Sequence, residues 1–383
     1  MKRYCKNINI LDLDFLKICV KDCLKKKWKR RDTRDFVARV AHKSHVEVRA
    51  MIMHGDKQPL IDAVAKHMQK QLAARDLRFV PIWYKDKIDA SSGKMRHIGI
   101  QHVSQQVYDY VAVYAMRDLF KRIGEHQYAS IPGRGPNKGV AKVRQWLKGR
   151  DAKVVAQLDV QKCFPSIPQD KLLALIDKFV ANDNVRWLVH QLVSTSDSGL
   201  LIGSYLSQYL CNWYMSFLCH KIKENMFSVR RCKRIPWVKH TLFYMDDILL
   251  VGTNVSAVHK AVKAIIKIAR DEMGLTIKPT WSVRKLLPGD FVDIMGFRVY
   301  CDHTTVRKRV FLRARRAYKR VIGAKRMTLQ QAQKCISYYS QLKNADLLRF
   351  CRKLKVFKSL RIAKRRVSHE SIVRHCAAVC ASP

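Results

Sequence analysis

The chain has 383 residues, and its 75 Lys plus Arg against 30 Asp plus Glu give a formal net charge of +45. This imbalance argues against an ordinary metabolic enzyme and indicates a polyanionic partner, with nucleic acid first and an anionic membrane surface as the weaker alternative. No apolar run is long enough to predict a membrane span, and the N-terminus lacks the apolar segment of a signal peptide. We therefore expect a cytoplasmic protein without membrane segments.

Twelve cysteines are scattered along the chain without a Cys-x-x-Cys pair, so a zinc ribbon is not expected. In a cytosolic protein they are interpreted as reduced residues that pack as small hydrophobes. The spacing of Cys376 and Cys380, with His375 beside them, leaves a metal site there as the alternative.

Basic helices are predicted at the N-terminus, where residues 1–55 form an extension. We assign its charge run at 25–31 to phosphate contact because the whole chain is so basic, although such a run usually marks a solvated helix face. An amphipathic helix at 56–77, a hairpin at 79–100 and a long helix at 103–123 are expected to follow.

Two basic segments of this region are candidate phosphate contacts. Lys94 and Arg96 lie beside the turn of the hairpin, where they could reach a triphosphate or a template phosphate, or could be ordinary edge-strand charge. Residues 131–139 form a Gly-rich turn that contains Arg134 and precedes a helix at 140–147. Backbone amides of such a loop can hold phosphate, and a plain connector is the alternative.

Two adjacent acidic residues, Asp246 and Asp247, interrupt the apolar segment 240–251 and are predicted at the tip of a β-hairpin. Neighbouring carboxylates are costly to hold together without a cation, and Mg²⁺ prefers oxygen ligands. A two-metal site needs a further carboxylate. The candidate is Asp159, which ends another apolar strand and has Val160 beside it. An ordinary Asp-rich turn is the alternative.

Further residues are candidate nucleotide contacts. Phe164 could close the floor beneath the sugar and exclude a 2′-hydroxyl, although a core aromatic is the default interpretation. Gly203 permits a tight turn and the close approach of a base pair, and Gln208 lies one turn into the helix that follows. Lys278, on a predicted strand at 275–278, could donate a proton to pyrophosphate or could be an exposed strand lysine.

Capping and periodicity predict the remaining elements. Ser256 is expected to cap an amphipathic helix that Gly274 ends. Segments 291–300 and 306–312 are predicted as a hairpin. The chain after them turns helical and very basic, with a capping box at 328–331.

The order of these motifs resembles that of a reverse transcriptase over about residues 79 to 350. Three palm motifs carry the likeness: Asp159 with Phe164, Gly203 with Ser207-Gln208, and Tyr244-Met245-Asp246-Asp247, which is the reverse-transcriptase form of the polymerase catalytic turn. The resemblance extends to the Lys278 segment, to the primer-grip motif Met295-Gly296-Phe297, and to the finger motifs Lys94-x-Arg96-x-Ile98 and Ile131-Pro132-Gly133-Arg134-Gly135.

The resemblance implies an α+β right-hand polymerase fold, with fingers over 56–150, a palm over 151–300 and a basic helical thumb over 301–383. It implies copying of an RNA template from a primer into cDNA with dNTPs and two Mg²⁺ ions. The residues implied to bind metal are Asp159, Val160, Asp246 and Asp247, the three aspartates being catalytic. Those implied to contact the nucleotide are Lys94, Arg96, Phe164, Ile202, Gly203, Gln208 and Lys278. Those implied to contact template or primer are Arg134, Tyr244, Met245 and Gly296.

Within this family, the Gly-x-x-x-Ser-Gln form at 203–208 resembles the enzymes of diversity-generating retroelements, which are bacterial or phage-encoded. This implies misincorporation opposite template adenine, with Ile202 as the candidate residue for that looseness, and a small basic accessory protein as a partner. One alternative is an antiviral-defence or retron-like enzyme that copies its own noncoding RNA. The alternative from another class is an RNA-binding or splicing factor that has lost its polymerase activity.

Overall fold

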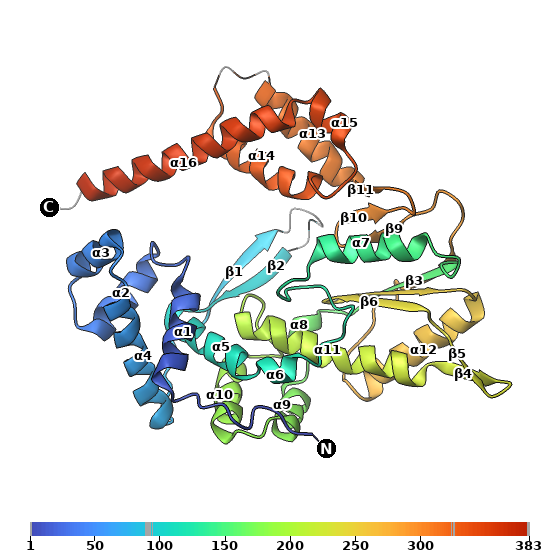
Figure 1. Ribbon diagram of the computed structural model, residues 1–383, viewed down its shortest axis with the longest axis horizontal. Coiled ribbons are helices and arrows are strands. Elements are labelled where there is room, and N and C mark those ends of the chain that lie inside the picture. Colours follow the sequence, from blue (N-terminus) through green and yellow to red (C-terminus); the bar gives the residue numbers. More distant parts are fainter. Residues whose placement is uncertain (1, 89–92, 94, 323, 325, 381–383) are drawn as a thin grey trace.

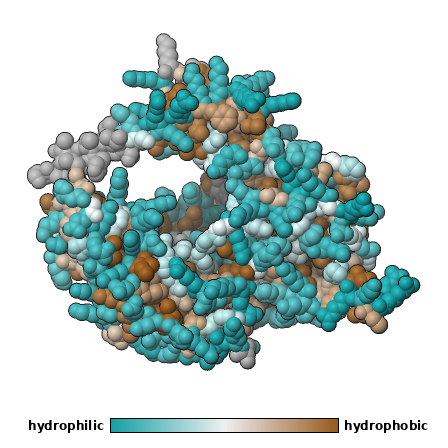
Figure 2. Space-filling model, viewed as in Figure 1, coloured by the Kyte–Doolittle hydropathy of each residue, from teal (hydrophilic) through white to brown (hydrophobic). Residues whose placement is uncertain are grey.

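The structure is a computed structural model that describes residues 2–88, 93, 95–322, 324 and 326–380. For residues 371–380 it describes the backbone alone. Lys94 and the side chains of Cys376 and Cys380, all singled out from the sequence, lie outside these described parts. Helices of the N-terminal region, a central sheet and a C-terminal group of helices are arranged around a hollow, which Figure 2 shows below the C-terminal helices.

The N-terminal region is helical, as predicted. Its four helices are α1 (Leu13–Leu24), α2 (Arg31–Ala41), α3 (His45–His54) and α4 (Gln58–Ala73). Side chains satisfy the first amides of two of them: Asp12 accepts from the backbone of Phe15, and Ser44 and Glu47 form a capping box. Helix α1 packs on α4 and on α5 (Val103–Ala115), so this region shares one apolar core with the middle of the chain.

The predicted hairpin at 79–100 is present as strands β1 (Trp83–Ile88) and β2 (Met95–Ile100). Two helices replace the single helix predicted at 103–123: α5 (Val103–Ala115) and α6 (Arg117–Phe120), with a break at Met116. The helix after the Gly-rich turn is α7 (Pro136–Leu147), which begins earlier than predicted because Pro136 fits the first helical turn.

A four-stranded antiparallel sheet forms the centre of the molecule, with strand order β6-β7-β3-β8. The strands are β3 (Val154–Asp159), β6 (His240–Tyr244), β7 (Asp247–Gly252) and β8 (Ser282–Lys285). Alternate side chains enter two different cores. Ala156 and Leu158 join the core that includes helices α11 (Tyr205–Asn225) and α12 (Val255–Asp271), whereas Val155 joins the core under α7 and the C-terminal helices. Burial on both faces explains why these strands are continuous apolar runs.

Several predicted boundaries around the sheet are wrong. The strand predicted at 275–278 is absent, and only an isolated bridge joins Ile277 to Val160. The end of the strand at Asp159 is as predicted, and the chain beyond it forms the short helix α8 (Cys163–Ser166). Asn254, not Ser256, caps α12, because its side chain is the one that accepts from the backbone of Ala257.

The segments between these elements are mostly helical. Helices α9 (Gln169–Phe179) and α10 (Asp183–Val193) connect α8 to α11, and the hairpin of β4 (Phe227–Arg230) and β5 (Lys233–Pro236) connects α11 to β6.

The C-terminal region begins with a second small sheet. Its strands are β9 (Val292–Ile294), β10 (Phe297–Val299) and β11 (Thr304–Val306). The hairpin predicted from 291–300 and 306–312 is therefore wrong in its second strand, because β11 ends at Val306. Helices α13 (Lys308–Ile322), α14 (Leu329–Leu342), α15 (Leu348–Lys353) and α16 (Val356–Cys380) follow, and the capping box at Thr328 is confirmed. In the described part of the chain, no helix is long and apolar enough to cross a membrane.

Candidate functional site

Three acidic residues from distant parts of the chain meet at one end of the central sheet. Strand β3 pairs with β7 so that Asp159 stands opposite Asp247, and the backbone N–H of Val160 donates to the carbonyl of Asp246 at 2.9 Å. The connection between β6 and β7 consists of Met245 and Asp246 alone, and Met245 has a φ of 54°. A non-glycine residue in this left-handed conformation stores strain of the kind that is common at functional turns.

The acidic side chains at this end of the sheet repel one another. Burial, followed by the nearby Asp246 and Asp159, raises the pKa of Asp247 to about 7. The pKa of Asp246 is raised by burial and then by Asp159. Carboxylates that share a poorly solvated site in this way favour a cation between them.

A lysine supplies positive charge there. The ammonium of Lys278 forms an ion pair with Oδ1 of Asp159, and the Lys278 backbone N–H donates to the Asp159 carbonyl at 2.8 Å. Lys278 therefore lies beside Asp159, and the strand on which the sequence placed the lysine does not form.

The oxygen donors at the sheet end suit a hard divalent cation, because they combine adjacent carboxylates with raised pKa values. The side chain of Val160 is aliphatic and buried, so only the backbone carbonyl of this residue is a possible ligand. Within the described residues, however, no three His, Cys, Asp or Glu side chains are gathered as a ready-made metal site. The residues fit such an ion chemically, and the Asp159 carboxylate is turned toward Lys278 instead.

The start of α11 lies against the first hairpin. The carbonyl of Ile202 accepts from the backbone N–H of Gly99 on β2 at 3.0 Å. Gly203 has a φ of 117°, and a Cβ there would lie 2.6 Å from the Gly99 carbonyl oxygen. The structure thus gives a reason for glycine at 203 that the sequence did not: it lets the backbone of α11's first turn touch β2.

Comparison with known families gives one match. The matching family is described as reverse transcriptase (RNA-dependent DNA polymerase), and it covers residues 85–297, more than half of the 383-residue chain. The chain belongs to the reverse transcriptase family. Enzymes of this family are nucleotidyltransferases that generally use divalent metal ions, and the mixed helices and sheets are those of its right-hand polymerase fold.

A search of curated proteins gives no match. Among solved structures, the apo telomerase of Candida tropicalis is 12% identical and has a TM-score of 0.44; the match covers 79% of the present chain and 59% of the telomerase chain. The telomerase of Candida albicans with a TWJ fragment of telomeric RNA is 10% identical, with a TM-score of 0.42 and coverages of 82% and 66%. The chain thus spans less than two thirds of the length of these telomerases.

Of the other predicted nucleotide contacts, Arg96 lies near the acidic residues. Arg96, on β2, is close enough that its positive charge lowers the pKa of Asp246, against the larger opposing effect of burial. Phe164 is half-buried on α8, where it packs against the main core and its carbonyl accepts from the Leu200 backbone at 2.8 Å. Gln208 is half-buried on the second turn of α11.

The residues predicted to contact template or primer lie in different surroundings. The guanidinium of Arg134 donates to the carbonyls of Gly124 and Gln127, so it holds its own loop together. Tyr244 and Met245 are half-buried, and Met245 packs against the main core. Gly296 has a φ of 87° with open space around it. Contact of these residues with nucleic acid stays a prediction.

Sequence reasoning missed Asp109, a fully buried carboxylate on α5. Its Oδ2 accepts from the hydroxyl of Ser204 at 2.7 Å and from the backbone of Tyr205 at 3.1 Å, both at the start of α11. Burial raises the pKa of Asp109 to about 6. The available signal was an acidic residue at an apolar position of an otherwise buried helix.

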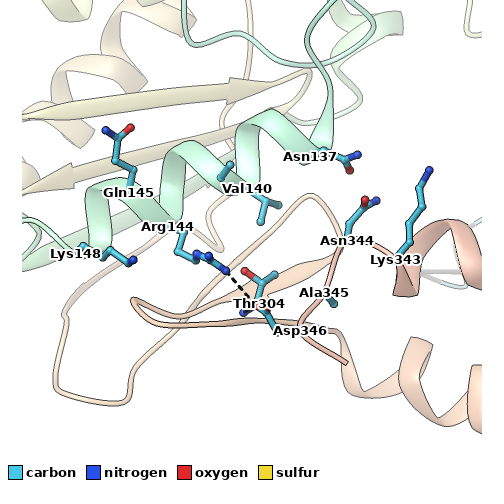
Figure 3. Close-up of a pocket in the computed structure, with 11 residues that line it drawn as sticks. Asn137, Val140, Arg144, Gln145, Lys148, Thr304, Lys343, Asn344, Ala345 and Asp346 are labelled. Atoms are coloured by element: carbon cyan, nitrogen blue, oxygen red, sulfur yellow. Dashed lines mark hydrogen bonds and ion pairs between the residues drawn. The ribbon is translucent and has the colours of Figure 1, made fainter. Parts of the chain in front are cut away.

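A pocket of about 450 Å³ lies between α7 and the C-terminal region, which contributes Thr304 and residues 343–346 (Figure 3). Arg144 of α7 reaches across it to Asp346, with 3.0 Å between the guanidinium and the carboxylate. The same carboxylate accepts from the backbone of Thr304 on β11 at 2.8 Å. The pocket's edge is therefore a place where α7 is tied to the C-terminal region.

Proposed function

We propose that this protein is an RNA-directed DNA polymerase that copies an RNA template into cDNA from dNTPs. The observation that carries the proposal is the register of β3 and β7, which sets Asp159 opposite Asp247 and beside the Asp246 turn. The reaction joins the 3′-oxygen of a primer to the α-phosphorus of a dNTP and releases pyrophosphate, so catalysis consists mainly of positioning and of neutralising charge.

The acidic residues would hold the divalent ions on which this chemistry depends. Asp159 and Asp246, with the carbonyl of Val160, would be the ligands of two Mg²⁺ ions, and Asp247 would support them. When bound, such ions activate the attacking hydroxyl and stabilise the leaving pyrophosphate. Lys278 would release Asp159 to the metal and would then be free to donate a proton to pyrophosphate.

Primer extension on an RNA template with dNTPs and Mg²⁺ tests the proposal. The wild-type protein should extend the primer, and Asp246→Asn should lower the rate by at least about 100-fold, the size of losing one preorganised electrostatic group. Asp302→Asn, a change at an exposed aspartate on the loop between β10 and β11, is the matched control and should leave the rate unchanged. Absence of extension by the wild-type protein contradicts the proposal and favours the splicing-factor alternative, in which the polymerase activity has been lost.

The same assay addresses the nucleotide contacts. Phe164 would exclude the 2′-hydroxyl, so Phe164→Ala should raise the incorporation of ribonucleotides. Arg96, together with Lys94, would bind the triphosphate, so Arg96→Ala should raise the apparent KM for dNTP. Unchanged sugar discrimination or an unchanged KM removes the corresponding assignment.

The finer proposal is that the protein serves a bacterial or phage-encoded diversity-generating retroelement. It is supported by the Gly-x-x-x-Ser-Gln form at 203–208 and by the half-buried Ile202 beside Gly203. Sequencing of the cDNA should then show errors concentrated opposite template adenine, and Ile202 variants should alter that pattern. An even error spectrum favours the defence or retron-like alternative. A small basic accessory protein in the cytoplasm would be a partner in this proposal.

A further inference from the structure

The β4–β5 hairpin extends from the main body of the protein. All side chains from 228 to 236 are exposed, and the hairpin forms the limb at the lower right of Figures 1 and 2. Two contacts fix its base: the guanidinium of Arg234 lies 4.6 Å from the centre of the Phe227 ring, and the indole of Trp237 donates to Ser228 at 2.7 Å. The hairpin is therefore held in place but contributes nothing to either apolar core.

The tip of this hairpin breaks two rules of local stability. Arg230 stands directly opposite Lys233, and like charges in that position repel. The two turn residues, Arg231 and Cys232, have φ values of 49° and 60°, a conformation that glycine and asparagine adopt far more easily. A segment that violates local preferences without a gain in packing is a candidate for function.

The tip is also far from the proposed catalytic residues. Helix α11 has 21 residues, which at about 1.5 Å per residue separates the hairpin from the Ser204 end of the helix by roughly 30 Å. Strand β6 likewise begins near the hairpin and ends at the Asp246 turn. The cations at the tip are therefore placed outside the site where a nucleotide would be joined.

We propose that the β4–β5 hairpin binds the phosphate backbone of a folded RNA segment outside the catalytic site. This rests on the proposed function, in which the protein holds RNA. Bound phosphates would relieve the repulsion between Arg230 and Lys233. Together with Arg231, which lies between them in the sequence, these residues present three positive charges at a fixed spacing. A small basic accessory protein is a poor partner for this surface because its charge has the same sign.

The test measures binding of transfer RNA, as a generic folded RNA, without nucleotides and over a range of salt concentrations. In the variant Arg230→Gln, Arg231→Asn, Lys233→Gln, affinity at low salt should fall at least tenfold. The slope of log K against log salt should become shallower by about one for each phosphate that the hairpin no longer neutralises, which is roughly two to three in all. Thermal stability should stay the same or rise, because the repulsion is gone and asparagine suits the turn.

The matched control removes three exposed lysines of α12 and β8, outside the hairpin: Lys263→Gln, Lys267→Gln, Lys285→Gln. Its affinity should fall much less than that of the hairpin variant. Equal decreases in both variants overturn the proposal, because net charge alone then explains binding. Extension of a short primer–template duplex should be unchanged in the hairpin variant, and a decrease there also overturns it. If the wild-type protein binds transfer RNA through the hairpin but extends no primer, the proposed polymerase fails while this inference stands.

Discussion

At the scale of single residues, Lys278 and the three aspartates act as one charged group. Lys278 is about three-quarters buried, and its ion pair with Asp159 supplies the positive charge that the adjacent acidic residues require. A metal ion bound by the same carboxylates would replace it. In the proposed function the lysine and the cation would compete for Asp159, and the sequence alone does not reveal the ion pair between Lys278 and Asp159.

This competition gives a prediction for Lys278→Met. Without divalent ions the variant should be less stable than the wild-type protein by about 1 kcal/mol, because the carboxylates lose their cation. Added Mg²⁺ should then stabilise the variant more than the wild type, since nothing competes for Asp159 and binding to the folded state adds to stability. Thermal unfolding with EDTA and with Mg²⁺ measures both effects.

The control for this prediction is Lys285→Met, which removes an exposed lysine from β8 in the same sheet. Its response to Mg²⁺ should match that of the wild-type protein. A Lys278→Met protein that gains no more from Mg²⁺ than the control would show that the lysine and the metal do not share Asp159.

At the scale of elements, the N-terminus of α11 depends on Asp109. The carboxylate accepts from Ser204 and Tyr205, and its negative charge lies at the positive end of the helix dipole. The same turn touches β2 through Ile202 and Gly203. Asp109 is therefore a positioning residue, because it fixes the turn that brings α11 and β2 together.

The pH dependence of stability tests this role. The pKa of Asp109 rises from 3.8 to about 6 on folding, so its stabilising contribution is complete below about pH 4 and is lost as the pH rises through 6. Asp109→Asn stays neutral, so its stability relative to the wild type should improve by roughly 3 kcal/mol between pH 4 and 7. Urea unfolding of both proteins across this range gives the difference.

Activity separates position from stability in the same variants. Asn keeps an oxygen acceptor for Ser204 and Tyr205, so Asp109→Asn should retain most primer extension. Asp109→Ala leaves these donors unpaired, at a cost of about 1–3 kcal/mol each, and should raise the KM for dNTP. Equal activity of the Ala and Asn variants at a temperature where both are folded would refute the positioning role.

The sequence predicted elements well where the pattern was local. Alternation and long apolar runs gave β3, β6 and β7, and these strands were enough to bring Asp159 near Asp246 and Asp247 as a hypothesis. The predictions from sequence failed where a contact between segments far apart in the chain decides the structure. The pattern at Lys278 is typical of a strand, yet only Ile277 pairs, with Val160, and the real partner strand of β3 starts at 282. The bonds of Asp109 depend on a helix about 95 residues away.

At the scale of the whole molecule, the central sheet joins two cores, and the thumb belongs to the second. Val155 of β3 shares that core with α7 and with the helices after β11. At its surface, Arg144 of α7 pairs with Asp346, whose carboxylate also accepts from Thr304 (Figure 3). Removal of the arginine would loosen the link to α7 while the bond to Thr304 remains.

We therefore predict that Arg144→Ala shortens the cDNA made in one binding event. Both charged side chains are partly exposed, so the ion pair should contribute no more than about 1 kcal/mol to folding. Addition of a single nucleotide, which depends on the palm, should be unchanged. A thumb held less firmly should release the template more often, so product length with an excess of unlabelled trap RNA is the measurement.

Lys148→Ala, on the same helix and lining the same pocket, is the matched control because it removes one positive charge without the ion pair to Asp346. Its product length should stay close to that of the wild-type protein. High salt should shorten the wild-type products toward those of Arg144→Ala, since salt screens an exposed pair. Equally short products from Lys148→Ala would mean that positive charge on α7, rather than its tie to the thumb, keeps the template bound.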